Sequence, residues 1–133
     1  MFQNNILRIL IIDDCPDIQG LLRTLLESKG YEVSSSSNGA EALSQLNLHS
    51  VLPDLILVDL RMPVMDGFDF LTSQRANPRL RDIPTVVMSA DGDARSTRLL
   101  TQAPNHGKSP DVLMKPLSIK SILTAIEGNS LLH

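Results

Sequence analysis

The chain has 133 residues, which is the usual length of one domain and enough to bury most of its apolar surface in a single core. Hydrophobic residues make up 42% and charged residues 20%, a balance typical of globular proteins that excludes a disordered or fibrous chain. The net charge of −3 is spread without long blocks of either sign, which argues against a nucleic-acid-binding protein.

Cysteine content and apolar runs indicate where the protein resides. The single cysteine, Cys15, cannot form an internal disulfide, and this favours a reducing compartment. The longest apolar stretch near the N-terminus, Ile9 to Ile12, is too short for a signal-peptide core or a membrane span. We therefore expect a cytoplasmic protein that does not bind a membrane.

The N-terminal segment predicts a strand, an acidic loop and a helix. The nearly continuous apolar run from Leu7 to Ile12 stops at Asp13 and Asp14, as expected of a parallel strand buried on both faces. After Pro16, apolar residues follow helical spacing until Gly30, which supplies a stop signal.

The middle of the chain repeats this alternation twice. Residues 31–36 predict a second, weaker strand, and Asn38 with the glycine after it introduces a second helix. A third strand over 55–58 ends at Asp59, and Gly67 opens the next helix.

The last third of the chain predicts two more strands and two helices. Residues 83–88 predict a fourth strand that ends at Ser89, and 112–114 predict a short fifth strand that ends at Lys115. The remaining predictions are a helix over 93–102, a loop with two prolines over 103–110, and a closing helix around Ile119 to Ile126.

This alternation predicts a doubly wound α/β domain with a five-stranded parallel sheet and helices on both faces, because parallel neighbours need crossover helices. Such sheets bind ligands beyond the carboxyl ends of their strands. Polar residues fall at these ends: Asp13 and Asp14 after the first strand, Asp59 after the third, Ser89 after the fourth and Lys115 after the fifth.

Three carboxylates at one sheet edge need a positive partner, because each close pair would repel by about 4 kcal/mol at an effective dielectric of about 20. Magnesium fits, since Mg²⁺ takes hard oxygen ligands and often shares its shell with a phosphate. Asp13 and Asp14 are adjacent, so both could reach one ion, directly or through water. Taken alone, the pair could instead cap a helix.

Asp59 is the candidate nucleophile for phosphoryl transfer. A carboxylate can form an aspartyl phosphate, and the reaction needs positioning and charge neutralisation at the transferring group. Mg²⁺ can bridge one phosphoryl oxygen, the Lys115 ammonium can pair with a second, and the Ser89 hydroxyl can donate a hydrogen bond to a third. The expected catalytic residues are therefore Asp59, Lys115 and Ser89.

Four strings, in order along the chain, resemble the signatures of the receiver domains of two-component response regulators. They are LIIDDCPD, LILVDLRMPVMDGFDFL, TVVMSA and LMKP, and together they span Leu10 to Pro116. The resemblance implies that the main-chain carbonyl of Arg61 also contacts the metal. The implied roles are metal acids for Asp13 and Asp14, phosphoacceptor for Asp59, switch hydroxyl for Ser89 and phosphate contact for Lys115.

The resemblance also implies a fold and a function. The implied sheet order is 2-1-3-4-5, as in flavodoxin-like folds, and residues 1–133 are expected to form a single receiver domain, with no output domain on this chain. Such a domain is a signalling switch, not an enzyme acting on other substrates. It would take its phosphoryl group from a histidine kinase or phosphotransfer protein, and then change the face that binds a downstream output protein or domain.

Two departures from the receiver pattern leave an alternative open. Receivers usually carry Tyr or Phe three residues before the lysine, where this chain has Val112, and the 25 residues over 90–114 exceed the number in many receivers by several. An unphosphorylated adapter with a receiver fold is therefore the alternative. A hydrolase of the haloacid dehalogenase type ranks last, because that family has an Asp-x-Asp motif after the first strand, and Asp13 is here followed by Asp14 and Cys15.

Overall fold

The computed structural model describes residues 7–90 and 111–130. The helix expected over 93–102 and the loop expected over 103–110 lie outside the described residues. Within the described residues, no helix is both long and apolar enough to cross a membrane. The elements are β1 (Arg8–Ile12), α1 (Pro16–Ser28), β2 (Glu32–Ser36), α2 (Gly39–Leu48), β3 (Leu55–Asp59), α3 (Gly67–Ala76), β4 (Thr85–Ser89), β5 (Asp111–Met114) and α5 (Ile119–Ser130).

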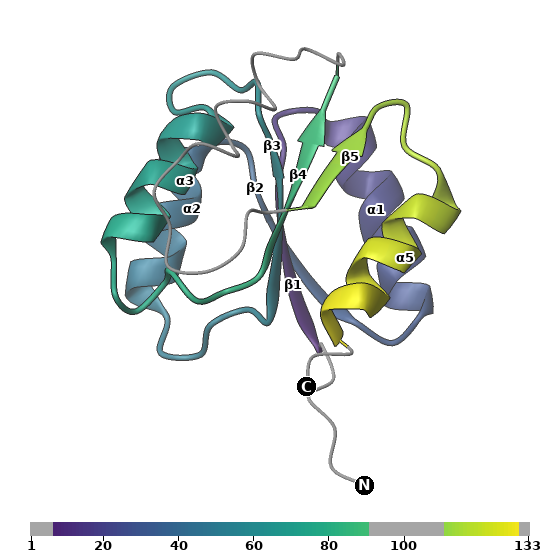
Figure 1. Ribbon diagram of the computed structural model, residues 1–133, viewed down its shortest axis with the longest axis horizontal. Helices are drawn as coiled ribbons and strands as arrows, with labels where there is room; N and C mark the ends of the chain where they lie inside the picture. Colours follow the sequence, from purple (N-terminus) through teal and green to yellow (C-terminus); the bar gives the residue numbers. More distant parts are fainter. Residues whose placement is uncertain (1–6, 91–110, 131–133) are drawn as a thin grey trace, which may run out of the picture.

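The five strands form one parallel sheet in the order β2-β1-β3-β4-β5, which confirms the predicted order (Figure 1). All neighbouring strands are parallel, so the carboxyl ends of all five strands lie at the same edge of the sheet. Ile12 pairs with Ser36 of β2 and with Val58 of β3, while Asp59 pairs with Met88 of β4. The residues that follow these strands therefore lie side by side.

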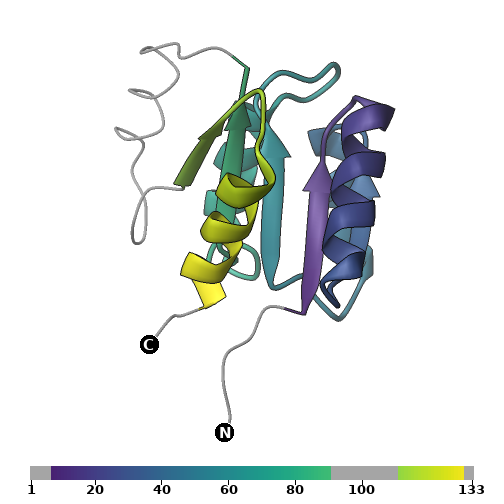
Figure 2. The same cartoon turned by 90° about the vertical axis from the view of Figure 1, so that its right-hand side faces the viewer.

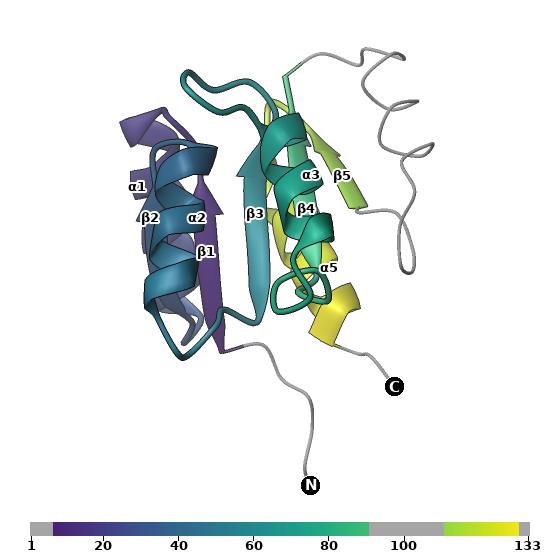
Figure 3. The ribbon, with the colours of Figure 1, turned by 90° about the vertical axis from the view of Figure 1, so that its left-hand side faces the viewer.

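Helices cover both faces of the sheet, as predicted. Helices α1 and α5 lie on one face (Figure 2), and α2 and α3 lie on the other (Figure 3). In β1, Leu10 and Ile12 belong to the apolar core under α2 and α3, whereas Ile9 and Ile11 belong to the core under α1 and α5. The continuous apolar run is therefore explained by burial of the strand on both faces.

The loop and helix boundaries follow local chemistry. The Asn38 side chain accepts a hydrogen bond from the Glu41 amide at 2.9 Å, and the Asp66 side chain accepts one from the Asp69 amide at 2.9 Å, so α2 and α3 begin with side-chain caps. Strand β4 begins two residues later than predicted, at Thr85, because Pro84 has no amide to donate.

Candidate functional site

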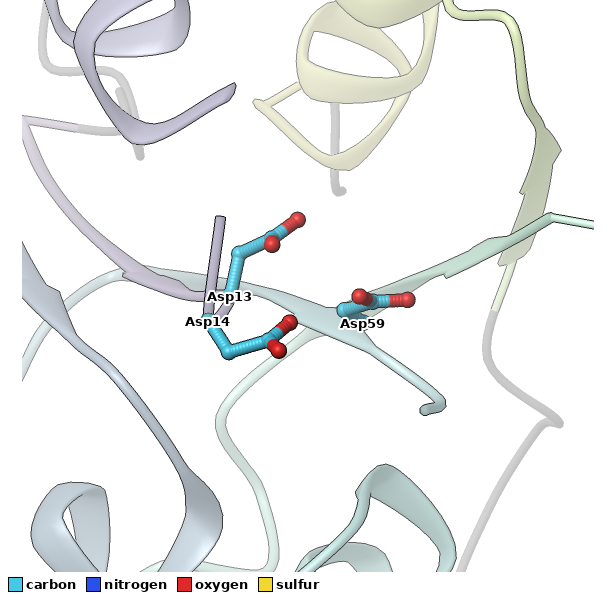
Figure 4. Close-up of side chains that lie close together, drawn as sticks. All are labelled: Asp13, Asp14 and Asp59. Atoms are coloured by element: carbon cyan, nitrogen blue, oxygen red, sulfur yellow. The ribbon is translucent and has the colours of Figure 1, made fainter. Parts of the chain in front are cut away.

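Three carboxylates meet at the carboxyl edge of the sheet (Figure 4). Asp13 and Asp14 follow β1, and Asp59 ends the neighbouring strand β3; carboxylate oxygens of the three residues all lie within 4.8 Å of one another. Asp13 is 0% exposed and Asp59 is 5% exposed, whereas Asp14 is exposed. The cluster is thus buried on the protein side and open to solvent at Asp14, and its oxygen donors are of the kind that a hard divalent cation prefers.

Lys115 supplies the positive charge that this cluster requires. Its Nζ lies 3.3 Å from Oδ2 of Asp59 and 3.4 Å from Oδ2 of Asp13. Lys115 follows β5, which is separated from β3 by β4, so the side chain crosses one strand to reach the acids. Its main-chain amide also donates to the carbonyl of Ser89 at 2.7 Å, which anchors the end of β5 to the end of β4.

Asp13 is held on every side by neighbouring groups. Its amide donates to the Ser36 carbonyl at 3.1 Å, and its Oδ1 accepts from the Cys15 amide at 2.9 Å. Its carbonyl accepts from Nε2 of Gln19 at 2.5 Å. Gln19 could not be predicted as a site residue, because a glutamine among the apolar residues of a helix carries no pattern that distinguishes it from a solvated side chain.

The main chain of Asp59 packs directly against the start of α3. The Gly67 amide donates to the Leu60 carbonyl at 2.9 Å, and a Cβ added to Gly67 would lie 2.5 Å from the Asp59 carbonyl oxygen and 2.7 Å from Cα of Leu60. A residue with a side chain cannot occupy this position unless the backbone moves. The expected helix start at Gly67 is confirmed, and the glycine is explained by this close approach.

The remaining predicted site residues, Ser89 and Arg61, lie at the same edge of the sheet and contact the site through their main chains. Ser89 ends β4 and is 4% exposed, next to the anchor that its carbonyl makes with Lys115. The Arg61 amide lies 3.5 Å from Oδ1 of Asp59, at the outer limit of a hydrogen bond. The structure therefore brings Asp13, Asp14, Asp59 and Lys115 together by side-chain proximity, and sets Ser89 and Arg61 beside them.

The acids and the lysine change the pKa values of Asp59 and Lys115. Burial raises the pKa of Asp59, and repulsion from Asp13 raises it further; attraction to Lys115 lowers it without cancelling these effects. Burial alone would lower the pKa of Lys115, but attraction to Asp13 and Asp59 outweighs burial and raises that pKa. An unneutralised negative charge on Asp59 is therefore unfavourable in the folded chain.

Asp59→Asn is accordingly expected to raise the free energy of unfolding of the metal-free chain at neutral pH. The folded-state pKa of Asp59 lies above its ordinary value of 3.8, so the folded state binds this proton more tightly than the unfolded state does. Stability is therefore lost as pH rises from about 3.8 through the folded-state pKa, and it stays lost at neutral pH. Asparagine carries no charge, and its advantage should fade as pH falls toward the ordinary value.

Urea unfolding in EDTA, at neutral pH and near pH 3.8, measures this difference. Asp82→Asn serves as the control, since Asp82 is exposed and the change should stay within about 0.5 kcal/mol of the wild type. A lower stability of Asp59→Asn than of the wild type at neutral pH would contradict the charge argument.

Comparison with known proteins places this geometry in a family. The family model described as "Response regulator receiver domain" matches residues 9–127. The transcriptional regulatory protein PrrA of Mycobacterium leprae is 34% identical over 121 residues, which cover 91% of this chain and 48% of that protein. The response regulator PleD of Caulobacter vibrioides is 39% identical over 110 residues, or 83% of this chain and 23% of PleD. The chain thus spans about half or less of the length of these two relatives.

Solved structures give the same picture. The receiver domain of a signal transduction histidine kinase from Syntrophus aciditrophicus superimposes with a TM-score of 0.80 at 30% identity, covering 92% of this chain and 88% of that chain. The chemotaxis protein CheY4 of Vibrio cholerae gives a TM-score of 0.81 at 24% identity, covering 96% of this chain and 99% of that chain, and shows likeness of fold alone.

Proposed function

The chain belongs to the response regulator receiver domain family, and on that basis we propose that it is a signalling switch that accepts a phosphoryl group on Asp59. Family membership supports a two-component phospho-signalling role, and the family is not a classical enzyme family, which removes the dehalogenase alternative. In the proposal, a histidine kinase or phosphotransfer protein donates the phosphoryl group. A downstream output protein or domain then binds the altered face of this single receiver domain.

One observation supports this proposal above the others. The buried Asp59 carboxylate lies 3.3 Å from the Lys115 ammonium, and its oxygen lies within 4.8 Å of the Asp13 and Asp14 carboxylates. A carboxylate held beside a fixed cation and two further acids has the surroundings that phosphoryl transfer to an aspartate needs.

The donor set also fits magnesium. Asp13, Asp14 and Asp59 would hold the ion, because hard oxygen ligands at this spacing match the preference of Mg²⁺. The resemblance to receivers adds the main-chain carbonyl of Arg61 as a further ligand. When bound, Mg²⁺ would supply positive charge to the carboxylates and to the oxygens of the transferring group. The exposed Asp14 leaves the ion's entry route open from solvent.

In the proposed transfer, Asp59 is the nucleophile, and Lys115 and Ser89 contact the phosphoryl oxygens. An oxygen of Asp59 forms a bond to phosphorus while the bond between phosphorus and the donor's imidazole nitrogen breaks, and that nitrogen leaves with the electron pair. Lys115 neutralises one phosphoryl oxygen from the position where it now pairs with Asp59 and Asp13. The Ser89 hydroxyl donates a hydrogen bond to another oxygen. Positioning and charge neutralisation account for the acceleration.

Lys115 and Ser89 also give the switch a route to the sheet edge. The Lys115 amide donates to the Ser89 carbonyl, so a shift of Ser89 toward a phosphoryl oxygen would pull on the end of β5. Val112 of β5 packs against the core under α2 and α3, in the position where receivers usually have an aromatic ring. We infer that signal output runs through the hydrogen bond that joins Lys115 to Ser89 at the ends of β5 and β4, and not through an aromatic side chain.

An unphosphorylated adapter is the second candidate function. The observation that favours it is Val112, which is partly buried against the core and has no ring to change position. Such an adapter would keep the receiver fold and bind its partner through a constant surface.

Incubation with acetyl phosphate and MgCl2, followed by intact mass measurement, distinguishes the two candidates. The wild-type chain is expected to gain one phosphoryl group, while Asp59→Asn gains none, because an amide is a far weaker nucleophile than a carboxylate. Asp69→Asn, which alters an exposed acid in α3, should be labelled like the wild type. An unlabelled wild type would favour the adapter, and equal labelling of Asp59→Asn would remove Asp59 as the acceptor.

A further inference from the structure

Gln19 of α1 reaches the carboxyl ends of two strands with one amide group. Its Nε2 donates to the carbonyl of Asp13 at 2.5 Å and to the carbonyl of Ser36 at 3.1 Å. The main-chain amide of Gln19 donates to the Cys15 carbonyl at 3.0 Å, so the residue is fixed within the first turns of the helix. Helix α1, the end of β1 and the end of β2 are thus joined at Gln19.

The hydrogen bonds of this junction are matched in number. A side-chain amide nitrogen carries two N–H donors, and the two carbonyls that it contacts can only accept, which fixes the orientation of the amide. The Ser36 carbonyl also accepts from the Asp13 amide at 3.1 Å and so uses both of its lone pairs. Loss of the Gln19 donors would remove this partner from the partly buried Asp13 carbonyl and leave the Ser36 carbonyl with the Asp13 amide alone.

The carbonyl of Asp13 is part of the peptide unit that joins Asp13 to Asp14. That unit is planar, so a hydrogen bond that fixes its oxygen also fixes the position of the Asp14 Cα. The Asp13 carboxylate is held separately, by the Cys15 amide and by Lys115. In residues 7–90 and 111–130 the Asp14 carboxylate has neither a hydrogen-bond nor an ion-pair partner, so its position depends on the backbone.

We propose that Gln19 is a positioning residue that holds Asp14 in place for magnesium, acting through the peptide between Asp13 and Asp14. Gln19 contacts neither the ion nor the phosphoryl group in this proposal, which rests on the metal site of the proposed function. Residues that orient metal ligands from outside the coordination shell commonly change metal affinity by about 10- to 100-fold when they are removed.

Titration with MgCl2, followed by the amide chemical shifts of Asp59 and Arg61, tests the proposal and can measure weak binding. Gln19→Met keeps the length of the side chain and removes both donors, and it is expected to raise the Kd for Mg²⁺ by about tenfold or more. Gln45→Met is the matched control: Gln45 of α2 donates to the Ser35 carbonyl at 3.4 Å, away from the acids, and its loss should leave the Kd unchanged.

A double-mutant cycle with Asp14→Asn separates positioning from a general loss of stability. In the Asp14→Asn background, Gln19→Met should weaken Mg²⁺ binding no further, because the ligand that Gln19 positions is already altered. Its effect on urea unfolding should persist in that background. If Gln19→Met does not fold, Gln19→Ala replaces it with the same expectation, since a smaller side chain lets water reach both carbonyls.

The outcomes separate this inference from the proposed function. A wild-type chain that binds no Mg²⁺ overturns both. A wild type that binds Mg²⁺, with an unchanged Kd in Gln19→Met, overturns only the role of Gln19. Equal losses of affinity with and without Asp14→Asn would also overturn it, because they would show that Gln19 does not act through Asp14.

Discussion

Gly67→Ala is expected to lower the free energy of unfolding by about 1 to 3 kcal/mol and to slow phosphorylation of Asp59. The added Cβ would lie 2.5 Å from the Asp59 carbonyl oxygen and 2.7 Å from Cα of Leu60, and both of these atoms belong to the backbone. No flexible side chain can yield, so the end of β3 or the start of α3 must move. A move of β3 displaces Asp59 from Lys115, which lies only 3.3 Å away.

Urea unfolding and the rate of labelling by acetyl phosphate measure the two parts of this expectation. Gly20→Ala is the matched control, because a Cβ added to Gly20 in α1 meets nothing within 4 Å. Alanine should stabilise that helix by roughly 0.5 to 1 kcal/mol. If Gly67→Ala were as stable as the wild type, the close approach of α3 to Asp59 would not constrain residue 67.

Lys115→Ala is expected to slow phosphorylation by about 10²- to 10³-fold, the usual loss when a preorganised group that stabilises transition-state charge is removed. The same change should tighten Mg²⁺ binding several-fold, because the lysine now competes for Asp59 and Asp13 from 3.3 and 3.4 Å. Opposite effects on rate and on metal affinity are the signature of a cation that shares its ligands with the metal.

Lys29→Ala provides the comparison for this variant. Lys29 is exposed and follows α1 at the opposite edge of the sheet, so its loss should change neither the rate nor the metal affinity. Labelling by acetyl phosphate, quenched at a series of times and at several MgCl2 concentrations, gives the rate of phosphorylation. The amide chemical shifts followed during titration with MgCl2 give the affinity for Mg²⁺. A normal rate in Lys115→Ala would mean that the ion pair with Asp59 is structural only.

The fold could be predicted from the sequence because its signals are local and repeated. Five apolar runs ending at polar residues indicate parallel strands, and the order of strands followed from the resemblance to receivers. The end of β4 was correctly placed at Ser89, whereas its beginning was placed too early, since apolar character continues through Ile83 and Pro84 although the ladder cannot. The first and last residues of a strand depend on which main-chain amides have hydrogen-bond partners, and this cannot be read from the apolar character of the residues.

Only the site residues that directly follow or end a strand could be predicted from the sequence. Asp13, Asp14 and Asp59 come together because β1 and β3 are neighbours, which the resemblance to receivers implied through the sheet order 2-1-3-4-5. Gln19 could not be found in this way, because its role depends on the reach of one side chain between a helix and two strand ends. The expectation that Val112 changes the route of signal output stays a prediction.

The position of the phosphoryl group tests the central claim most directly. After reaction of the wild-type chain with acetyl phosphate and MgCl2, reduction with borohydride converts an aspartyl phosphate to homoserine, and peptide mass spectrometry then identifies the altered residue. The account predicts homoserine at residue 59 and an unmodified aspartate at residues 13 and 14. Homoserine at residue 13 or 14, or a reacted chain without homoserine at residue 59, would contradict it.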